Sequence, residues 1–402
     1  MKKRFLTVNI LIFCFLFSVL SGCQNSADRL MQEALKLETA ENYEKAAEKY
    51  LEVIEYHPDN IDAYLKSVDC YLNSNNSEKA EIQIKLLNRY FPDYLEGYML
   101  LGDFLIDEGR SDEALKLFLE MVELFPDSPY GYINASELYL KSNDREAALN
   151  LCLKLIADLP DCPDGYIKTS EIFFEDFRYS TAITILADGY RITGDSSVKE
   201  KYKDISKYIS LSFNDPVFER IVRNYLDRPE GIVTVRDISD IKKIEINGVS
   251  KRDRKNINNR KIIIDGVEQP EVRGSIYSLS DLSNFLLLEE LEINFMPLTN
   301  ISPLLSLKSL KRVSMSETGI RDLSGIESLI SLKELKLDYS EISDISPLKK
   351  LPNLKRLSFA GNRVKDAEVL KSIKGLEFLD IRDNPIKGNS LFDELSISEF
   401  LY

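Results

Sequence analysis

The feature that most constrains this chain is a pattern that returns every 34 residues between residues 27 and 196. Pro-Asp pairs close successive units at Pro58, Pro92, Pro126 and Pro160, and small and aromatic residues recur in step at Ala46, Ala80, Ala114, Ala148, Ala182, Tyr64, Tyr98, Tyr132 and Tyr166. Within a unit, apolar residues fall at i, i+3, i+4 and i+7 on both sides of a polar turn, which predicts a helical hairpin. One hairpin cannot bury its apolar face alone, so the five units are predicted to stack.

The central unit carries the clearest version of this pattern. It reads Tyr98-x-x-Leu101-Gly102-x-x-Leu105, then Ala114-x-x-x-Phe118-x-x-Met121, and closes on Pro126. This string resembles the tetratricopeptide repeat. The resemblance implies an all-α superhelix of five helical hairpins over residues 27–196, in which the first helix of each unit lines a concave groove.

Three columns of residues are predicted to line this groove when the repeat is stepped through its first helix. The acidic column is Asp69, Asp103, Glu137 and Glu171, which Leu35 precedes in the first unit, and the apolar columns are Leu65, Met99, Ile133, Ile167 and Leu72, Ile106, Leu140, Phe174. An apolar groove with an acidic stripe suits a protein or peptide partner that carries basic and apolar residues. The alternative interpretation is that the stripe is only the solvated face of an acidic protein.

Charge is divided unevenly along the chain. Residues 24–196 hold 34 Asp and Glu against 16 Lys and Arg, hence a net charge of −18, whereas residues 197–402 carry +1. Neither part has the basic surface that phosphate binding requires, so a nucleic-acid partner is disfavoured.

A second period, of 22 residues, runs from residue 288 to residue 386. Its inward positions are Leu288, Leu310, Leu332, Leu354, Leu376 and Leu291, Val313, Leu335, Leu357, Leu379. The alternation predicts one short strand per unit with one buried face. Together with turns such as Asp344-Ile345-Ser346-Pro347-Leu348, it resembles the short bacterial leucine-rich repeats of internalins. The resemblance implies that residues 232–402 form an α/β leucine-rich-repeat domain with a short-strand parallel sheet, so that the chain is two solenoids joined by capping helices within 197–231.

Two departures from the leucine-rich pattern are visible. The turn Asn of the family stands only at Asn362 and Asn384, while Met296, Thr318 and Ser340 occupy the other slots, so the ladder of side-chain hydrogen bonds to the backbone is not expected in the earlier units. Residues 251–261 form a basic polar loop, which we interpret as a surface insertion rather than a binding site.

The concave face of the predicted sheet presents charged and aromatic side chains. Charges of alternating sign, such as Glu290 and Arg312, are expected to pair across neighbouring strands for well under 1 kcal/mol each. Phe295, Tyr339 and Phe378 are candidate partner contacts, because exposed rings are frequent anchors at interfaces. Alternatively, these rings shield adjacent repeats.

The first 26 residues predict export. Lys2, Lys3 and Arg4 precede an apolar run that is too short to cross a bilayer comfortably, which is typical of a secretory signal over residues 1–22. Leu20-Ser21-Gly22-Cys23 resembles a bacterial lipobox, which implies a lipid on Cys23, a tether over 23–26 and anchoring to the outer membrane or cell surface. The alternative is an ordinary secreted protein with a free thiol there.

Catalytic and redox signals are weak. The sequence has one His, at His57, and no phosphate loop, nucleophile elbow or zinc-protease helix, so no catalytic residue, metal, cofactor or small-molecule substrate is assigned. Cys70, Cys152 and Cys162 remain after processing; a Cys152–Cys162 bridge is conceivable, and inert thiols are favoured. The predicted function is a membrane-anchored interaction scaffold or adhesin-like receptor. A periplasm-facing envelope assembly factor is the alternative, and an enzyme is the least favoured class.

Overall fold

The computed structural model divides the chain into two compact units, residues 1–159 and residues 160–402. The structure describes residues 27–248, 261–270, 276–387, 395 and 397–402. The predicted signal segment, Cys23, the tether and residues 251–260 of the basic loop lie outside the described residues. The division falls inside the 34-residue series, so the fifth repeat belongs to the same compact unit as the sheet.

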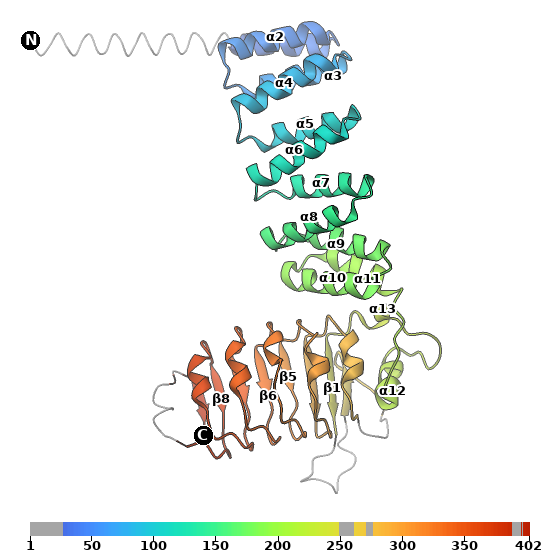
Figure 1. Cartoon of the computed structure of the whole chain (residues 1–402), viewed down its shortest axis with the longest axis vertical. Coiled ribbons are helices and arrows are strands. Elements are labelled where there is room, and N and C mark those ends of the chain that lie inside the picture. Colours follow the sequence, from blue (N-terminus) through green and yellow to red (C-terminus); the bar gives the residue numbers. More distant parts are fainter. Residues whose placement is uncertain (1–26, 249–260, 271–275, 388–394, 396) are drawn as a thin grey trace, which may run out of the picture. The chain divides into compact units, whose positions relative to one another are not determined.

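The first unit is a series of helical hairpins (Figure 1, blue to green). Residues 27–39 are helical, and α2 (Tyr43–Tyr56), α3 (Ile61–Asn73), α4 (Ser77–Tyr90), α5 (Leu95–Asp107), α6 (Ser111–Leu124), α7 (Tyr130–Lys141) and α8 (Arg145–Asp158) follow. The recurring Ala46, Ala80 and Ala114 have no exposed surface, which confirms the predicted core column. Small residues at these positions let neighbouring helices approach closely.

Gly102 lies where α5 packs tightly against α6. A Cβ placed on Gly102 of α5 would lie 2.2 Å from Cε1 of Phe118 on α6. Phe118 itself is fully buried. Gly102 is therefore needed to make room for the Phe118 ring, and not to give the backbone extra conformational freedom.

The turn within each hairpin has one residue with positive φ. The residues are Glu41 (58°), Asn75 (55°), Gly109 (72°), Asn143 (62°) and Phe177 (58°). Gly and Asn tolerate this left-handed conformation, whereas a bulky aromatic residue rarely adopts it.

The second unit begins with the fifth hairpin and continues through three further helices. Its helices are α9 (Pro163–Glu175), α10 (Tyr179–Thr193), α11 (Ser196–Ser206), α12 (Pro216–Tyr225) and α13 (Val235–Ile238). Asp215 caps α12 by accepting the backbone N–H groups of Val217 and Phe218 at 2.8 and 3.1 Å. The capping helices predicted after residue 196 are thus present as α11 and α12.

The strands of the described residues form one sheet in the order β3-β2-β1-β4-β5-β6-β7-β8-β9. They are β1 (Lys243–Asn247), β2 (Lys261–Ile264), β3 (Val267–Glu268), β4 (Glu290–Asn294), β5 (Arg312–Ser314), β6 (Glu334–Lys336), β7 (Arg356–Ser358), β8 (Phe378–Asp380) and β9 (Glu399–Leu401). From β1 through β4 to β9 all pairs are parallel, with Leu291 opposite Val313 and Val313 opposite Leu335. This register confirms the predicted short-strand parallel sheet.

The connections between these strands contain short 3₁₀ turns. These are η2 (Ser280–Asn284), η3 (Ser302–Leu304), η4 (Ile326–Ser328), η5 (Ser346–Lys350) and η6 (Glu368–Ser372). The repeating Leu positions beneath them, from Leu288 to Leu376, are buried, which confirms the predicted core.

An antiparallel hairpin at the start of the sheet was not predicted. β2 pairs with β1 and with β3, and Asp265-Gly266 form the turn with φ of 46° and 80°. An Asp-Gly pair between apolar residues is a strong hairpin signal, because both positions of this turn need positive φ. The sequence therefore contained a signal for this hairpin, although the hairpin is not part of a regular repeat.

The ladder of side-chain bonds extends further than expected. Asn362 donates to the carbonyl oxygens of Leu337 and Phe359, both at 2.8 Å, and accepts the N–H of Ile342. The expectation that earlier units lack such bonds is wrong for Thr318, whose hydroxyl donates to Met315 O at 3.1 Å and lies 3.0 Å from the Ser340 hydroxyl. A hydroxyl is shorter than an amide but reaches the same carbonyl, so the ladder continues with fewer bonds.

Candidate functional site

The predicted groove residues are all at least partly accessible. Exposed or half-buried side chains occur at every position of the acidic column and of both apolar columns, and none of them is buried. Leu35 and Leu72 are exposed by 51% and 39%. The described geometry is therefore compatible with an open face on the first helices.

Three of the predicted residues line one hollow in the first unit. The hollow has a volume of ≈ 370 Å³ and is lined by Asp103, Ile106, Asp107, Phe118, Asn134, Glu137, Leu138 and Lys141. Asp103 and Ile106 lie on α5, and Glu137 lies on α7, so residues from two successive repeats meet in this hollow. Three acids and a single base give the hollow a negative character, with apolar surface between them.

The acids of the stripe differ in their surroundings. Asp103 accepts a hydrogen bond from the Tyr130 hydroxyl, and burial together with this carboxylate raises the pKa of Tyr130. Desolvation by burial raises the pKa of Asp69, with Lys66 opposing the shift and Glu38 and Asp62 adding to it. Asp69 and Asp103 therefore lie in a region where negative charge is concentrated.

Glu171, in the second unit, is an exception. Its carboxylate forms an ion pair with Lys201 of α11 at 2.6 Å. A partner that binds Glu171 must first compete with this internal cation. The column predicted from the repeat is uniform in sequence but not in electrostatic character.

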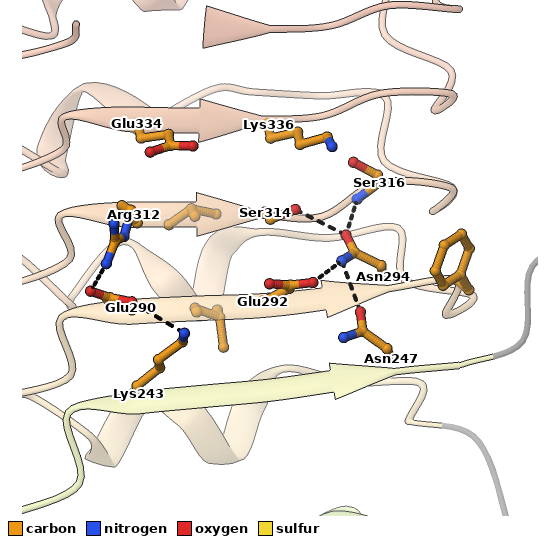
Figure 2. A pocket seen from close by; sticks show the side chains of 13 residues that line it. Lys243, Asn247, Glu290, Glu292, Asn294, Arg312, Ser314, Ser316, Glu334 and Lys336 are labelled. Carbon is orange, nitrogen blue, oxygen red and sulfur yellow. Dashed lines mark hydrogen bonds and ion pairs between the residues drawn. The ribbon is translucent and has the colours of Figure 1, made fainter. Parts of the chain in front are cut away.

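The concave face of the sheet holds a larger hollow, of ≈ 610 Å³, lined mainly by β1, β4, β5 and β6 (Figure 2). Its charged lining residues are Lys243, Arg312, Lys336, Glu290, Glu292 and Glu334. Arg312 donates to Glu290, which confirms the expected pairing for these two residues, and Lys243 lies 3.7 Å from the same carboxylate. Equal numbers of cations and anions leave this face without a dominant charge.

Asn294 organises the middle of that hollow (Figure 2). Its amide donates to Asn247 and Glu292, both at 2.8 Å, and its oxygen accepts the N–H of Ser316 at 2.7 Å. Asp338, two repeats later, accepts the Ala360 N–H at 3.0 Å in the same way. Neither residue was identified from the sequence, although Asn294 and Asp338 are polar residues that stand 44 positions, or two repeats, apart at strand ends.

Family models match both periods. The tetratricopeptide repeat model matches residues 37–103 and 105–168, and the model of leucine-rich repeats in two copies matches residues 330–372. The chain carries tetratricopeptide repeats followed by leucine-rich repeats. Helical hairpins in the first part and a parallel sheet in the second are the folds that these models describe.

Solved structures with similarity to the chain are distant. They include YrrB, described as a TPR protein with an unusual peptide-binding site (16% identity, 42% of this chain and 87% of that chain, TM-score 0.30), and an internalin, InlF, from Listeria monocytogenes (20%, 45% and 60%, TM-score 0.32). PilF from Pseudomonas aeruginosa is another (15%, 46% and 93%, TM-score 0.30). No curated protein sequence matches the chain.

The three aromatic candidates of the leucine-rich repeats do not line one hollow. Phe295 lines the large hollow, whereas Phe378 lines a second one of ≈ 310 Å³. Phe295 and Tyr339 follow the strands at positive φ, and Phe378 lies within β8 beneath Arg356, whose guanidinium is 4.3 Å from the ring. A partner contact through all three rings would span two hollows.

Other candidate chemistries find little support among the described residues. Cys70, Cys152 and Cys162 are free thiols, so the conceivable Cys152–Cys162 bridge is absent. Within the same part of the chain, no cluster of His, Cys, Asp and Glu is placed to hold a metal ion. None of the described helices has the length and apolar content needed to span a bilayer.

Proposed function

We propose that this protein is a lipid-anchored, exported scaffold or adhesin-like receptor that captures a protein segment in the groove of its tetratricopeptide repeats. The observation that carries the proposal is the hollow in which Asp103, Ile106 and Glu137 converge. Repeats of both kinds are typically interaction modules without catalytic activity.

The chemistry of the hollow defines the segment that fits. Asp103, Asp107 and Glu137 favour Lys or Arg, and Lys141 is the one base among the lining residues. Ile106 and Phe118 provide apolar surface between the acids. A segment with a basic residue next to an apolar side chain satisfies both features, since charge sets orientation and apolar contact adds affinity.

Photo-crosslinking in living cells tests this groove. A photoreactive amino acid at position 106 is expected to trap a partner, which mass spectrometry then identifies. The double variant Asp103→Lys/Glu137→Lys should lower the yield at least about tenfold, because two attractive contacts become repulsive. The control Asp93→Lys/Asp127→Lys makes the same charge change at exposed turn positions and should leave the yield unchanged. Equal loss in both variants would contradict the groove assignment.

The anchor and location are proposed from the first residues of the sequence. Replacing Cys23 by Ser should move the protein from the membrane fraction to the soluble fraction. Retention of the variant on membranes would contradict the lipid anchor.

The two functional classes differ in which side of the envelope the repeats face. Protease treatment of intact cells should remove the leucine-rich repeats of an adhesin-like receptor. It should leave them intact in an envelope assembly factor that faces the periplasm, which is the second candidate.

A further inference from the structure

Four aromatic rings gather on the surface where the fifth tetratricopeptide repeat meets α11. Phe174, Tyr179 and Tyr208 have ring centroids 5.2–5.6 Å apart, and Phe177 lies 6.2 Å from Tyr179. Although they touch one another, Phe177 and Tyr208 remain 79% and 52% exposed. Apolar surface of this kind on a soluble domain commonly marks an interaction site.

The sequence of the turn gives an independent reason to single out Phe177. The equivalent positions are Glu41, Asn75, Gly109 and Asn143, and all of them share its positive φ. A large ring is disfavoured in this conformation, and here the ring contributes little to the core because it projects into solvent. Folding alone therefore does not account for a phenylalanine at this position.

These rings border an open hollow of ≈ 390 Å³ whose charge is opposite to that of the groove. It is lined by Phe177, Arg178, Tyr179, Ser180, Thr181, Tyr208, Ile209 and Ser210. No acid lines it, although Glu175 and Asp176 precede it in sequence. Arg178 lines the hollow, and its guanidinium lies 4.5 Å from the Phe173 ring. Lys207 is not a lining residue, but its ammonium lies 5.2 Å from the ring of Tyr208, which is one.

The helix that starts at this hollow adds to the positive field. α10 begins at Tyr179 with no side-chain cap and no acid in its first turn. The hydroxyls of Ser180, Thr181 and Ser210 supply further hydrogen-bond donors. The surface thus combines aromatic walls and hydroxyl donors with Arg178 in the lining and Lys207 over the Tyr208 ring.

We propose that this aromatic hollow is a second peptide-docking site, which takes an acidic segment with a carboxylate next to a proline or another apolar residue. The carboxylate lies toward Arg178 and Lys207, and the apolar residue packs against Phe177 and Tyr208. A peptide is favoured over an anionic lipid surface because Arg178 is the one cation that lines the hollow, whereas binding to anionic lipids typically uses a cluster of basic residues. The proposal does not depend on the groove, whose acids select the opposite charge.

Two substitutions remove the site while following the sequence of other repeats. Phe177→Asn reproduces Asn75 and Asn143, and Arg178→Asp reproduces Asp144, whose side chain caps α8 by accepting from Ala147 N at 3.0 Å. Both changes should keep or raise the melting temperature, since Asn tolerates positive φ and Asp is a favourable helix cap. A loss of binding in these variants is then not explained by unfolding.

The test uses the full chain and a random dodecapeptide display library. The wild-type protein should enrich acidic peptides that contain proline or apolar residues. Their affinity, measured by fluorescence anisotropy, should fall at least about tenfold in Phe177→Asn and in Arg178→Asp. Arg178→Asp should also bind a Lys-for-Glu copy of the selected peptide more tightly than the wild type does. The groove variant Asp103→Lys/Glu137→Lys should bind the selected acidic peptides unchanged.

Several results would overturn the proposal. These are the absence of acidic peptides after selection, equal binding by the wild type and both hollow variants, and an equal loss in the groove variant. Binding to phosphatidylglycerol vesicles that disappears in Phe177→Asn and Arg178→Asp would assign the hollow to a lipid surface instead.

Discussion

The carboxylate of Asp281 accepts the backbone N–H of Asp215 at 2.8 Å, and the two residues are 66 positions apart in the chain. Asp281 also accepts the backbone and side-chain N–H groups of Asn214 at 2.7 and 3.0 Å. Asp215 in turn caps α12 and accepts the N–H of Tyr277 at 3.2 Å. Both carboxylates are buried, so this network fixes the start of α12 against η2 at the entrance to the leucine-rich repeats.

Replacing Asp281 by Ala should destabilise the second unit by about 3 kcal/mol, because three donors lose a charged acceptor in a buried place. Hydrogen exchange of α12 measures the effect locally, and urea unfolding followed by circular dichroism measures it globally. Asp344→Ala removes an exposed carboxylate that accepts one turn N–H, from Ser346, and should have a clearly smaller effect. Similar losses in both variants would show that the buried network adds little.

The surroundings of Asp237 predict that the stability of the second unit depends on pH. Burial opposes its ionisation, yet hydrogen bonds from the Thr234 N–H and hydroxyl, together with Arg228 at 3.0 Å, hold the pKa of Asp237 below its ordinary value of 3.8. A carboxylate whose pKa is lower in the folded than in the unfolded protein stabilises the fold at pH values above its unfolded pKa. This stabilisation is lost as the pH falls through the folded pKa. Asp237→Asn should therefore cost about 1 kcal/mol at pH 7 and progressively less below pH 4. Urea unfolding at several pH values measures this, and a constant difference down to pH 3 would contradict it.

Gly102 and Phe118 should be energetically coupled. Gly102→Ala is expected to destabilise the first unit by about 1–3 kcal/mol, because the new methyl group overlaps the buried ring. In Phe118→Leu the ring is gone, so the same Gly102→Ala change should cost much less. A double-mutant cycle from urea unfolding gives the coupling, and additive losses would mean that the helices separate without strain.

Periodicity determined which parts of the structure were predictable. In a stack of repeats each buried position contacts the equivalent position of the next unit, so Ala46, Ala114, Leu310 and Leu332 were assigned to the core from spacing alone. The hairpin at Asp265-Gly266 was missed because it interrupts the period. A local turn signal carried that information, and the repeat pattern did not.

The candidate sites show the same limit. The repeat spacing pointed to Asp103, Ile106 and Glu137, and these three residues line one hollow. The repeat spacing did not show that Lys201 pairs with Glu171, because α11 follows the last repeat and the earlier repeats have no equivalent helix. The aromatic hollow was missed for the same reason: Tyr208 follows α11 and completes the cluster around Phe174 from outside the period.

The common register of the parallel strands has a consequence for how such a chain changes over time. Val313 pairs with Leu335, and Leu335 pairs with Leu357. Because these inward residues occupy the same position in each strand, the strand of one repeat also fits beside the strand of another. Gain or loss of one whole 22-residue module leaves every remaining pairing in phase. The area of the concave face therefore grows or shrinks by one repeat at a time, while the cross-section of the domain stays the same.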